Sequence, residues 1–394
     1  MDKLKISARS DVEPFIAMDV MRDANALERQ GGLKSKIIHL EVGQPSTAAP
    51  RLVRDAAAHA LAHERLGYTD ALGLPKLRER IARHYGEHYG VDIDPARVAV
   101  TAGSSGGFML SFLACFDAGA RVAISEPGYP AYRNILKALG LEPVGIPVGP
   151  ETRWSMTPDL IDAAERKHGP LAGVLVASPA NPTGTMMTPE ALEALAKSCQ
   201  ANGRWFISDE IYHGITFGAP EATALAYSPD VIVANSFSKY YSMTGWRLGW
   251  LVVPERLVRP LERLAQNLFI SPSTLAQEAS IAAFDAREEL DANVTVYAAN
   301  RDLLLKALPA AGIANFAPAD GAFYLYADVS SLVGQGANMD SVQFCHRMLH
   351  EVGVAATPGL DFDPHRGHQT VRFSFAGSTA EMAEAAERLK NWLA

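Results

Sequence analysis

Short apolar runs alternate with helical patterns through the middle of the chain. Seven of these runs are typical of buried strands, and they lie at Val98–Ala102, Arg121–Glu126, Val144–Val148, Ala172–Ser178, Trp205–Ile211, Val231–Phe237 and Leu248–Val253. Helical patterns such as Pro189–Asn202 fill most of the gaps between them. Strands joined by helix-length crossovers predict an α/β fold, with a mostly parallel seven-stranded sheet flanked by helices.

A different pattern occupies the two ends of the chain. Helical periodicity runs from Pro14 to Gln30 and again through Thr274–Ala307. The last hundred or so residues mix short strands with two helical patterns, namely Phe323–Tyr326, Ser341–Val352, Val354–Gly359, Val371–Phe375 and Thr379–Trp392. We therefore expect a large α/β domain over residues 45–285 and a smaller α+β domain formed by residues 1–44 together with 286–394.

Composition and charge narrow the range of partners. The 394 residues carry a formal net charge of −8 with the charges spread along the chain, so nucleic acid is not an expected partner. No window approaches the roughly 18 to 20 apolar residues of a membrane span. The three cysteines lack the spacing of a metal or redox motif, and the N-terminus shows no signal core. We expect a cytoplasmic protein with free thiols and no metal site.

Polar or aromatic side chains follow five of the predicted strands where each strand ends. They are Ser104 and Ser105, Tyr129, Asn181, Asp209 and Lys239. In such sheets a ligand binds beyond the carboxyl ends of the strands. The glycine turn Gly103–Gly107 before a helical pattern also favours an anion, because backbone N–H groups and the helix dipole point to one spot. A tight turn without a ligand is the alternative.

The segment around Lys239 carries the strongest chemical signal. Small hydroxyl residues flank the lysine, and Arg247 follows closely. An amine near cationic groups can form a Schiff base with a carbonyl compound, while Arg and Ser can hold a phosphate. Asp209 could pair with a protonated pyridine nitrogen, and Arg372, in an apolar strand, needs an anion. A surface lysine and a helix-capping aspartate are the simpler interpretations of each residue alone.

Three segments together resemble a known family. Their sequences SPANPTG, SDEIY and SFSKYYSMTGWRLG, in this order and spacing, are similar to the class I and II aminotransferases, the pyridoxal-5′-phosphate (PLP) enzymes of fold type I in the aspartate aminotransferase superfamily. The resemblance extends from Gly43 to Arg372, which is nearly the whole chain. It implies an enzyme that moves an amino group between an L-amino acid and a 2-oxo acid.

The resemblance also implies a role for each matching residue. Lys239 would form the Schiff base and carry the proton between the substrate and the cofactor, and Asp209 would keep the pyridine nitrogen protonated. The remaining cofactor contacts would come from Asn181 and Tyr212 at the ring hydroxyl, Tyr129 and Ile211 on the ring faces, and Ser104, Ser105, Ser236, Ser238 and Arg247 at the phosphate.

Substrate and partner expectations come from the same resemblance. Arg372 would bind the substrate α-carboxylate with help from Gly43 and Asn181, and Tyr68 would reach the phosphate of a neighbouring subunit in a homodimer. Tyr129 stands where aspartate-specific members carry Trp, and no counterpart of a second arginine is evident. The apolar candidates for the side-chain pocket are Phe15, Ile16, Phe217 and Phe269, which favour a neutral amino donor.

Three alternatives remain open from the sequence. A PLP-dependent β-lyase would share the scaffold and the first proton transfer by Lys239. An α/β-hydrolase would use Ser105 of the G-x-S-x-G match as nucleophile, with a late base such as His368. A non-catalytic PLP-binding regulator is the third, although no fused DNA-binding segment is evident.

Overall fold

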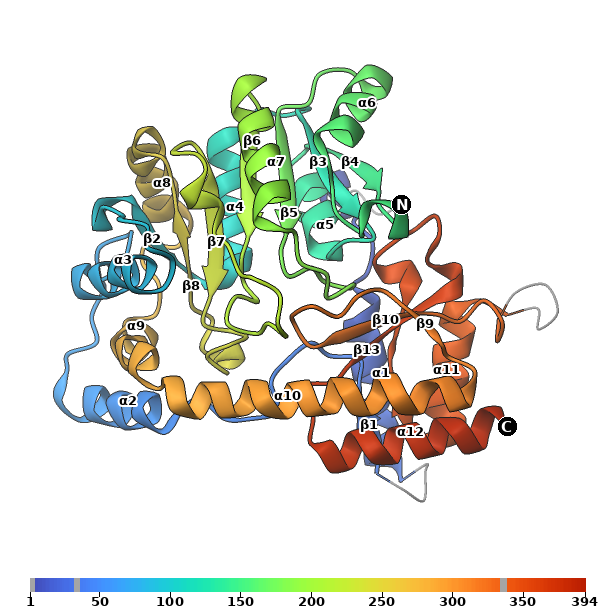
Figure 1. Ribbon diagram of the computed structural model, residues 1–394. Helices are drawn as coiled ribbons and strands as arrows, with labels where there is room; N and C mark the ends of the chain where they lie inside the picture. The colour runs from blue at the N-terminus through green and yellow to red at the C-terminus, as the bar shows by residue number, and fades with distance from the viewer. Residues whose placement is uncertain (1–3, 32–35, 334–338) are drawn as a thin grey trace.

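A seven-stranded sheet forms the centre of the larger part of the protein (Figure 1). The structure is a computed structural model that describes residues 4–31, 36–333 and 339–394. The strands of this sheet, in the order in which they lie, are β2 (Val98–Thr101), β8 (Gly249–Val252), β7 (Ile232–Ser236), β6 (Trp205–Asp209), β5 (Gly173–Ala177), β3 (Arg121–Glu126) and β4 (Glu142–Pro147). Only β8 runs against its neighbours. The predicted mostly parallel sheet is therefore confirmed.

Helices cover both faces of this sheet because successive side chains of each strand point to opposite sides. Phe206 of β6 belongs to the core on one face, and its neighbour Ile207 belongs to the core on the other. The first face is covered by α2 (Arg51–His63), α3 (Pro75–Tyr89), α6 (Pro158–His168), α7 (Pro189–Ala201) and α9 (Thr274–Ser280). The second is covered by α4 (Gly103–Cys115), α5 (Pro130–Ala138) and α8 (Glu255–Leu268).

Local sequence signals fix where several of these helices begin and end. The hydroxyl of Thr188 accepts a hydrogen bond from Ala191 N at the start of α7, and Pro189 occupies the first helical position. Helix α3 ends at Gly90, whose φ of 68° lies in the left-handed region. One boundary differs from expectation, because α4 begins at Gly103 and the predicted glycine turn is its first helical turn.

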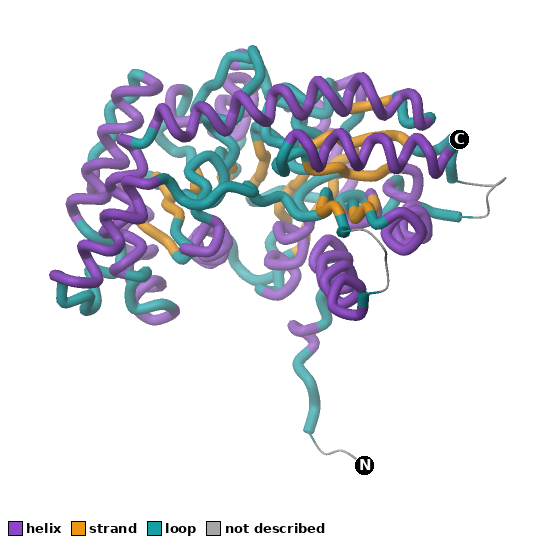
Figure 2. Tube along the Cα trace, turned by 90° about the horizontal axis from the view of Figure 1, so that it is seen from below, coloured by secondary structure: helices purple, strands orange, loops and turns teal. Residues whose placement is uncertain are grey.

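The smaller part combines segments from both ends of the chain. A four-stranded antiparallel sheet has the order β12 (Thr357–Pro358), β13 (Thr370–Ser374), β10 (Tyr324–Asp328) and β9 (Asn315–Phe316). The N-terminal strand β1 (Ile38–His39) pairs in parallel with β11 (Val354–Ala355). The helices of this part are α1 (Ile16–Gln30), α11 (Ser341–Val352) and α12 (Thr379–Leu393). The segment ahead of α1 extends away from the body, as Figure 2 shows.

The long helix α10 (Arg287–Ala307) links the two parts and runs alongside both in Figure 1. Leu290 near its start packs into the core of the large sheet, whereas Leu304 near its end packs into the core of the small sheet. The domain bounds expected from the sequence stay a prediction. Among the described residues, no helix is both long and apolar enough to cross a lipid bilayer.

Candidate active site

A cavity of about 220 Å³ lies at the carboxyl edge of the large sheet, where the small sheet faces it. The large part contributes Ser104, Ser105, Tyr129, Tyr132, Asn181, Asp209, Ile211, Tyr212, Ser238, Lys239, Thr244 and Arg247 to its lining. The N-terminal segment contributes Phe15, Ala17, Met18, Glu41, Val42, Gly43 and Gln44, and the small sheet contributes Tyr324 and Arg372. Twelve of the fourteen residues that the sequence selected therefore meet in one place.

Lys239 projects into this cavity from the turn after β7. Its Nζ donates a hydrogen bond to the backbone oxygen of Gly43 and lies 5.6 Å from the ring centroid of Tyr212. Burial lowers the pKa of the Lys239 amine to about 8, and the positive charge of Arg372 acts in the same direction. The amine is thus neutral far more often near pH 7 than an exposed lysine.

Asp209, the last residue of β6, is buried with only 3% of its surface exposed. Its carboxylate accepts hydrogen bonds from the Tyr132 hydroxyl and from the backbone N–H of Ile211, the latter at 3.1 Å. Burial raises the pKa of Asp209 to about 6, although both hydrogen bonds oppose that rise. A buried carboxylate of this kind is well suited to pair with a protonated ring nitrogen.

Two phenols meet beside Lys239. The hydroxyl oxygens of Tyr212 and Tyr324 are 2.5 Å apart, and both side chains are buried. Burial raises the pKa of Tyr212 well above its ordinary value and also raises the pKa of Tyr324. Both phenols are therefore protonated near pH 7 and can donate hydrogen bonds. Tyr324 also fills the space at Gly43, where an added Cβ would lie 1.8 Å from the phenol oxygen. Gly43 is therefore needed for a close approach.

Arg372 is held rigidly on β13. Its guanidinium donates to Asn181 Oδ1 at 2.8 Å and to Thr357 Oγ1 at 3.2 Å, and it also donates to the Glu41 carbonyl. It lies over two aromatic rings, with the guanidinium carbon 4.4 Å from the Tyr324 centroid and 4.7 Å from the Phe362 centroid. A fixed cation of this kind can receive a carboxylate at the edge of the cavity.

An anion cradle lies at the other end of the cavity. Ser104 and Ser105 occupy the first turn of α4, whose N–H groups have no partner within the helix. Gly103 has a φ of 70°, and a Cβ there would lie 2.8 Å from Nη2 of Arg247. Arg247 is exposed, and its guanidinium donates to the Thr244 carbonyl at 3.1 Å. The guanidinium of Arg247 and the N-terminus of α4 can attract a phosphate, and the missing side chain of Gly103 leaves space for it.

Two residues that the sequence selected do not line the cavity. The hydroxyl of Ser236 is buried and donates to the Leu248 carbonyl at 2.9 Å, with Ser238 Oγ also at 2.9 Å. Tyr68 is 84% exposed and borders a separate surface hollow with Ser271 and Thr274. Ser236 therefore supports Ser238 from behind, and Tyr68 does not reach the cavity of its own chain.

The apolar pocket predicted from the sequence is correct only in part. Phe15 lines the cavity and packs edge-on against Tyr129, with ring centroids 5.7 Å apart. Ile16 lies outside the cavity, Phe217 packs against Phe375, and Phe269 joins the core beneath α4 and α8. The cause is tertiary, because apolar residues of equal hydrophobicity can belong to a core or to a site. Met18, one helical turn after Phe15, takes their place.

Tyr132 and Tyr324 are the main residues that the sequence analysis missed. Tyr132 lies three residues after Tyr129, so helical spacing put it on the same side of α5. Tyr324 lies in a predicted apolar strand that pairs with the strand of Arg372. Both signals were present, but each tyrosine resembled an ordinary core residue.

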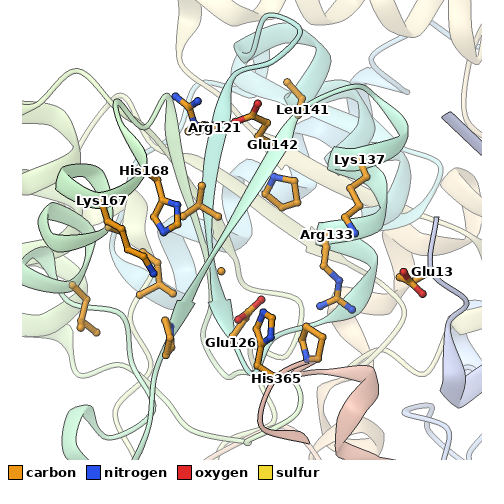
Figure 3. A pocket seen from close by; sticks show the side chains of 18 of the residues that line it. Glu13, Arg121, Glu126, Arg133, Lys137, Leu141, Glu142, Lys167, His168 and His365 are labelled. Atoms are coloured by element: carbon orange, nitrogen blue, oxygen red, sulfur yellow. Dashed lines mark ion pairs between the residues drawn. The ribbon is translucent and has the colours of Figure 1, made fainter. Parts of the chain in front are cut away.

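A larger hollow of the surface lies elsewhere, along the edge strand β4 (Figure 3). It measures about 1110 Å³, and charged residues such as Arg133, Lys137 and Lys167 surround it. None of the residues predicted to bind cofactor lines it. Pro143 and Pro147 face outward from β4 and lack an N–H group, which protects this edge against a further strand. The smaller cavity therefore remains the candidate active site.

The hydrolase alternative does not fit the arrangement. Ser105 borders the cavity, but His368 does not, and its side chain is 55% exposed. The nearest acidic partner of His368 is Asp340, whose Oδ2 is 3.9 Å from Nδ1. Serine and histidine therefore do not form a nucleophile–base pair.

Comparisons with known proteins agree with this geometry. The family model for aminotransferase class I and II matches residues 35–389. A valine–pyruvate aminotransferase of Mycobacterium tuberculosis is 49% identical over 393 residues, which cover 99% of this chain and 98% of that protein. The crystal structure of an aminotransferase from Mycobacterium tuberculosis has a TM-score of 0.95 at 49% identity and covers 99% of each chain. Aspartate aminotransferase from Thermus thermophilus with maleate has a TM-score of 0.91 at 29% identity, covering 98% of this chain and 99% of that one.

Proposed function

Since the chain belongs to the class I and II aminotransferases, we propose that it moves the amino group of a neutral L-amino acid to a 2-oxo acid, with PLP held at Lys239. The transfer of an amino group between an amino acid and a 2-oxo acid is the activity of its relatives. One observation carries the assignment of the site. The buried cavity brings together an amine of lowered pKa, a buried carboxylate and a fixed guanidinium, namely Lys239, Asp209 and Arg372.

The cavity offers a suitable group for the phosphate, the ring nitrogen and the ring hydroxyl of PLP. The cradle formed by the start of α4 and Arg247 suits a phosphate, and Gly103 leaves room for it. Asp209 is a buried carboxylate that accepts hydrogen bonds from Tyr132 and Ile211, and a protonated ring nitrogen would give it a charged partner. Asn181 and Tyr212 provide an amide and a phenol for the ring hydroxyl. When bound, PLP supplies a carbonyl for the amino donor and an electron sink for the bond that breaks.

Lys239 would be the amine that holds the cofactor and, when substrate is bound, the base that takes the proton from the substrate Cα. Its lowered pKa makes about one molecule in ten neutral at pH 7, against roughly one in 3,000 for an ordinary lysine. The backbone oxygen of Gly43 accepts a hydrogen bond from Nζ and so fixes where the amine points. The proton therefore leaves and returns on the side of the cavity that Lys239 occupies.

Arg372 orients the substrate for that proton transfer. Its guanidinium can bind a carboxylate as a bidentate pair, and its contacts to Asn181 and Thr357 keep it from following the ligand. A substrate held at its carboxylate and at its amino group leaves one freedom, rotation about the line between them. The apolar wall of Phe15 and Met18 limits that rotation by receiving the side chain.

The same wall supports a neutral amino donor. Among the described residues of this chain, the cations that line the cavity are Lys239, Arg247 and Arg372, and each already has a role in the proposal. A second substrate carboxylate would therefore remain unpaired in a cavity with an apolar wall, which is unfavourable. The similarity to the valine–pyruvate aminotransferase also supports a branched aliphatic donor and pyruvate as the acceptor.

We further propose a homodimer in which Tyr68 completes the partner's phosphate site. Tyr68 is 84% exposed and lies on a loop anchored by a hydrogen bond between Thr274 Oγ1 and the Gly67 carbonyl. Ile270, close to the same anchor in sequence, is 52% exposed. Exposed apolar side chains on an anchored surface are typical of an interface between copies.

The free thiols of Cys115, Cys199 and Cys345 support a reducing, cytoplasmic location.

Mixing two inactive variants tests the dimer. In a hybrid of Lys239→Ala and Tyr68→Ala subunits, one site carries both changes and the other is intact. Activity that returns on mixing supports the exchange of Tyr68, whereas two variants that stay inactive together contradict it. Light scattering gives the mass of the assembly independently.

A spectroscopic panel tests the reaction. We expect the purified protein to absorb in the visible region, borohydride to fix the chromophore to Lys239, and Lys239→Ala to lose it. Valine, alanine and aspartate are then added singly, and the conversion of the cofactor to its amine form is followed. Conversion by valine but not aspartate supports a neutral donor. Release of pyruvate and ammonia from a β-substituted amino acid would instead identify the lyase, and a colourless protein labelled at Ser105 by a phosphonate would refute the proposal.

A further inference from the structure

Tyr324 connects parts of the cavity that lie on different sheets. It belongs to β10 of the small sheet, and it is 1% exposed. Its phenol oxygen lies 2.5 Å from that of Tyr212, which follows β6 of the large sheet. Its ring centroid lies 4.4 Å from the guanidinium carbon of Arg372. One side chain therefore touches both the phenol proposed for the ring hydroxyl and the cation proposed for the substrate.

The hydroxyl of Tyr324 fixes the direction of the hydrogen bond between the phenols. Each phenol can donate one hydrogen bond. If Tyr212 donates its hydrogen bond to the ring hydroxyl, as the proposed function requires, Tyr324 must be the donor in the hydrogen bond between the two tyrosines. A donor that itself accepts a hydrogen bond is polarised and donates more strongly.

The ring of Tyr324 acts on Arg372 in a different way. The guanidinium carbon lies over the rings of Tyr324 and Phe362, 4.4 Å and 4.7 Å from their centroids. Such contacts stabilise a desolvated cation and favour its position over the aromatic faces. This effect needs the aromatic face and does not need the hydroxyl.

We propose that Tyr324 is a positioning residue with two separable functions in this site. Its hydroxyl strengthens the hydrogen bond that Tyr212 donates to the cofactor, and its ring orients Arg372 for the substrate carboxylate. The inference rests on the proposed function and adds a residue outside the three segments on which the resemblance to the family was based. A tyrosine that only filled the core would be replaceable by Phe without any change at the cofactor.

Tyr324→Phe tests the hydroxyl. Hydrogen-bond donors stabilise negative charge on the ring oxygen, and this charge is largest when the visible chromophore has lost its proton. We therefore expect the pKa of the visible band to rise by about 0.3 to 0.7 of a unit, while the dissociation constants of acetate and isovalerate stay within about twofold. These carboxylates carry no amino group, so they bind without reacting.

Tyr324→Leu tests the ring. It removes the hydroxyl and the aromatic face together, so acetate and isovalerate should bind about 3- to 30-fold more weakly than to Tyr324→Phe. The control is Tyr85→Phe, which removes another buried phenol, one that accepts a hydrogen bond from Trp250 Nε1 at 3.1 Å and does not line the cavity. We expect this control to leave both the pKa of the band and the carboxylate affinities unchanged.

Specific outcomes would overturn the inference. A pKa that stays or falls in Tyr324→Phe would mean that Tyr324 does not donate to Tyr212. Equal carboxylate affinities in Tyr324→Leu and Tyr324→Phe would show that the ring does not orient Arg372. If Tyr324→Phe already bound carboxylates more weakly than the wild type, the hydroxyl and not the ring would be responsible. A wild-type protein without a visible band would instead refute the proposed function, so the two failures are distinguishable.

Discussion

The hydroxyl of Tyr132 donates a hydrogen bond to the carboxylate of Asp209, and neither side chain is accessible to solvent to more than a few per cent. Asp209 ends a strand, whereas Tyr132 lies on α5, which covers the second face of the same sheet. Tyr132 is held in place by edge-on contacts with Phe108 and Tyr129, with ring centroids 5.1 Å and 5.2 Å away. The bond opposes the effect of burial and favours the ionised carboxylate.

Loss of this bond should weaken cofactor binding at low pH. In Tyr132→Phe the pKa of Asp209 rises beyond about 6, because burial is no longer opposed by the phenol. The ionised form, which in the proposed function pairs with the ring nitrogen, is present above this pKa and is lost as the pH falls through it. We expect PLP affinity, measured by fluorescence between pH 5 and 8, to decline at a higher pH than in the wild type. At the acid end the loss should be about tenfold or more.

The same titration separates this effect from general destabilisation. Tyr85→Phe removes a buried phenol outside the cavity and should leave the transition of PLP affinity in place. An unchanged transition in Tyr132→Phe would show that Asp209 does not depend on the phenol.

The lowered pKa of Lys239 predicts how the protein incorporates its cofactor. The neutral amine is the reactive form, and its fraction increases about tenfold per pH unit until the pKa is passed. For Lys239 this occurs at about 8, because burial disfavours the ammonium. The rate of PLP incorporation into the cofactor-free protein should therefore rise from pH 6 and level off near pH 8. The rate at which PLP reacts with the amine of Nα-acetyl-lysine should continue to rise beyond pH 10. A rate of incorporation into the protein that also rises beyond pH 10 would contradict the lowered pKa.

Gly43→Ala should disturb the cavity through Tyr324. The added Cβ would lie 1.8 Å from the phenol oxygen and 2.7 Å from Cζ, so the ring must move. We expect a loss of about 1 to 3 kcal/mol in the free energy of unfolding, measured with denaturant, and a decrease in kcat/KM. Gly86→Ala, within α3, is the matched control. Apart from its chain neighbours and the backbone of the helix itself, no atom of the described residues lies within 4 Å of the added Cβ. It should stabilise the protein by about 0.5 to 1 kcal/mol.

Arg372→Lys keeps the charge but should not keep the function. The guanidinium binds Asn181, Thr357 and the Glu41 carbonyl at once, and an ammonium cannot reproduce this geometry. We expect kcat/KM for the amino donor to fall about 100-fold, mainly through KM. Arg347→Lys, at a surface ion pair with Glu351, is the control and should have little effect. Equal kcat/KM values for Arg372→Lys and the wild type would place the substrate carboxylate elsewhere.

Much of the fold and of the site could be predicted from the sequence, because both depend on local patterns. Strands of buried residues separated by helix-length crossovers specify a parallel sheet, and β2 to β8 lie within a few residues of their predicted positions. Polar residues at the ends of such strands must gather at one edge. Lys239, Asp209 and Asn181 follow three such strands, and all three line the same cavity.

The tertiary structure alone decided which side chains support those residues. Tyr132 and Asp209 are 77 residues apart, Tyr212 and Tyr324 are 112 apart, and Arg372 and Asn181 are 191 apart. No local pattern distinguishes a tyrosine that packs in a core from one that donates a hydrogen bond in a site. Whether Phe15 or Phe217 faces the cavity likewise depends on how α1 and the loop after β6 pack against the small sheet. The sequence alone determined the chemistry at the strand ends, and the packing of distant segments determined the partners that tune it.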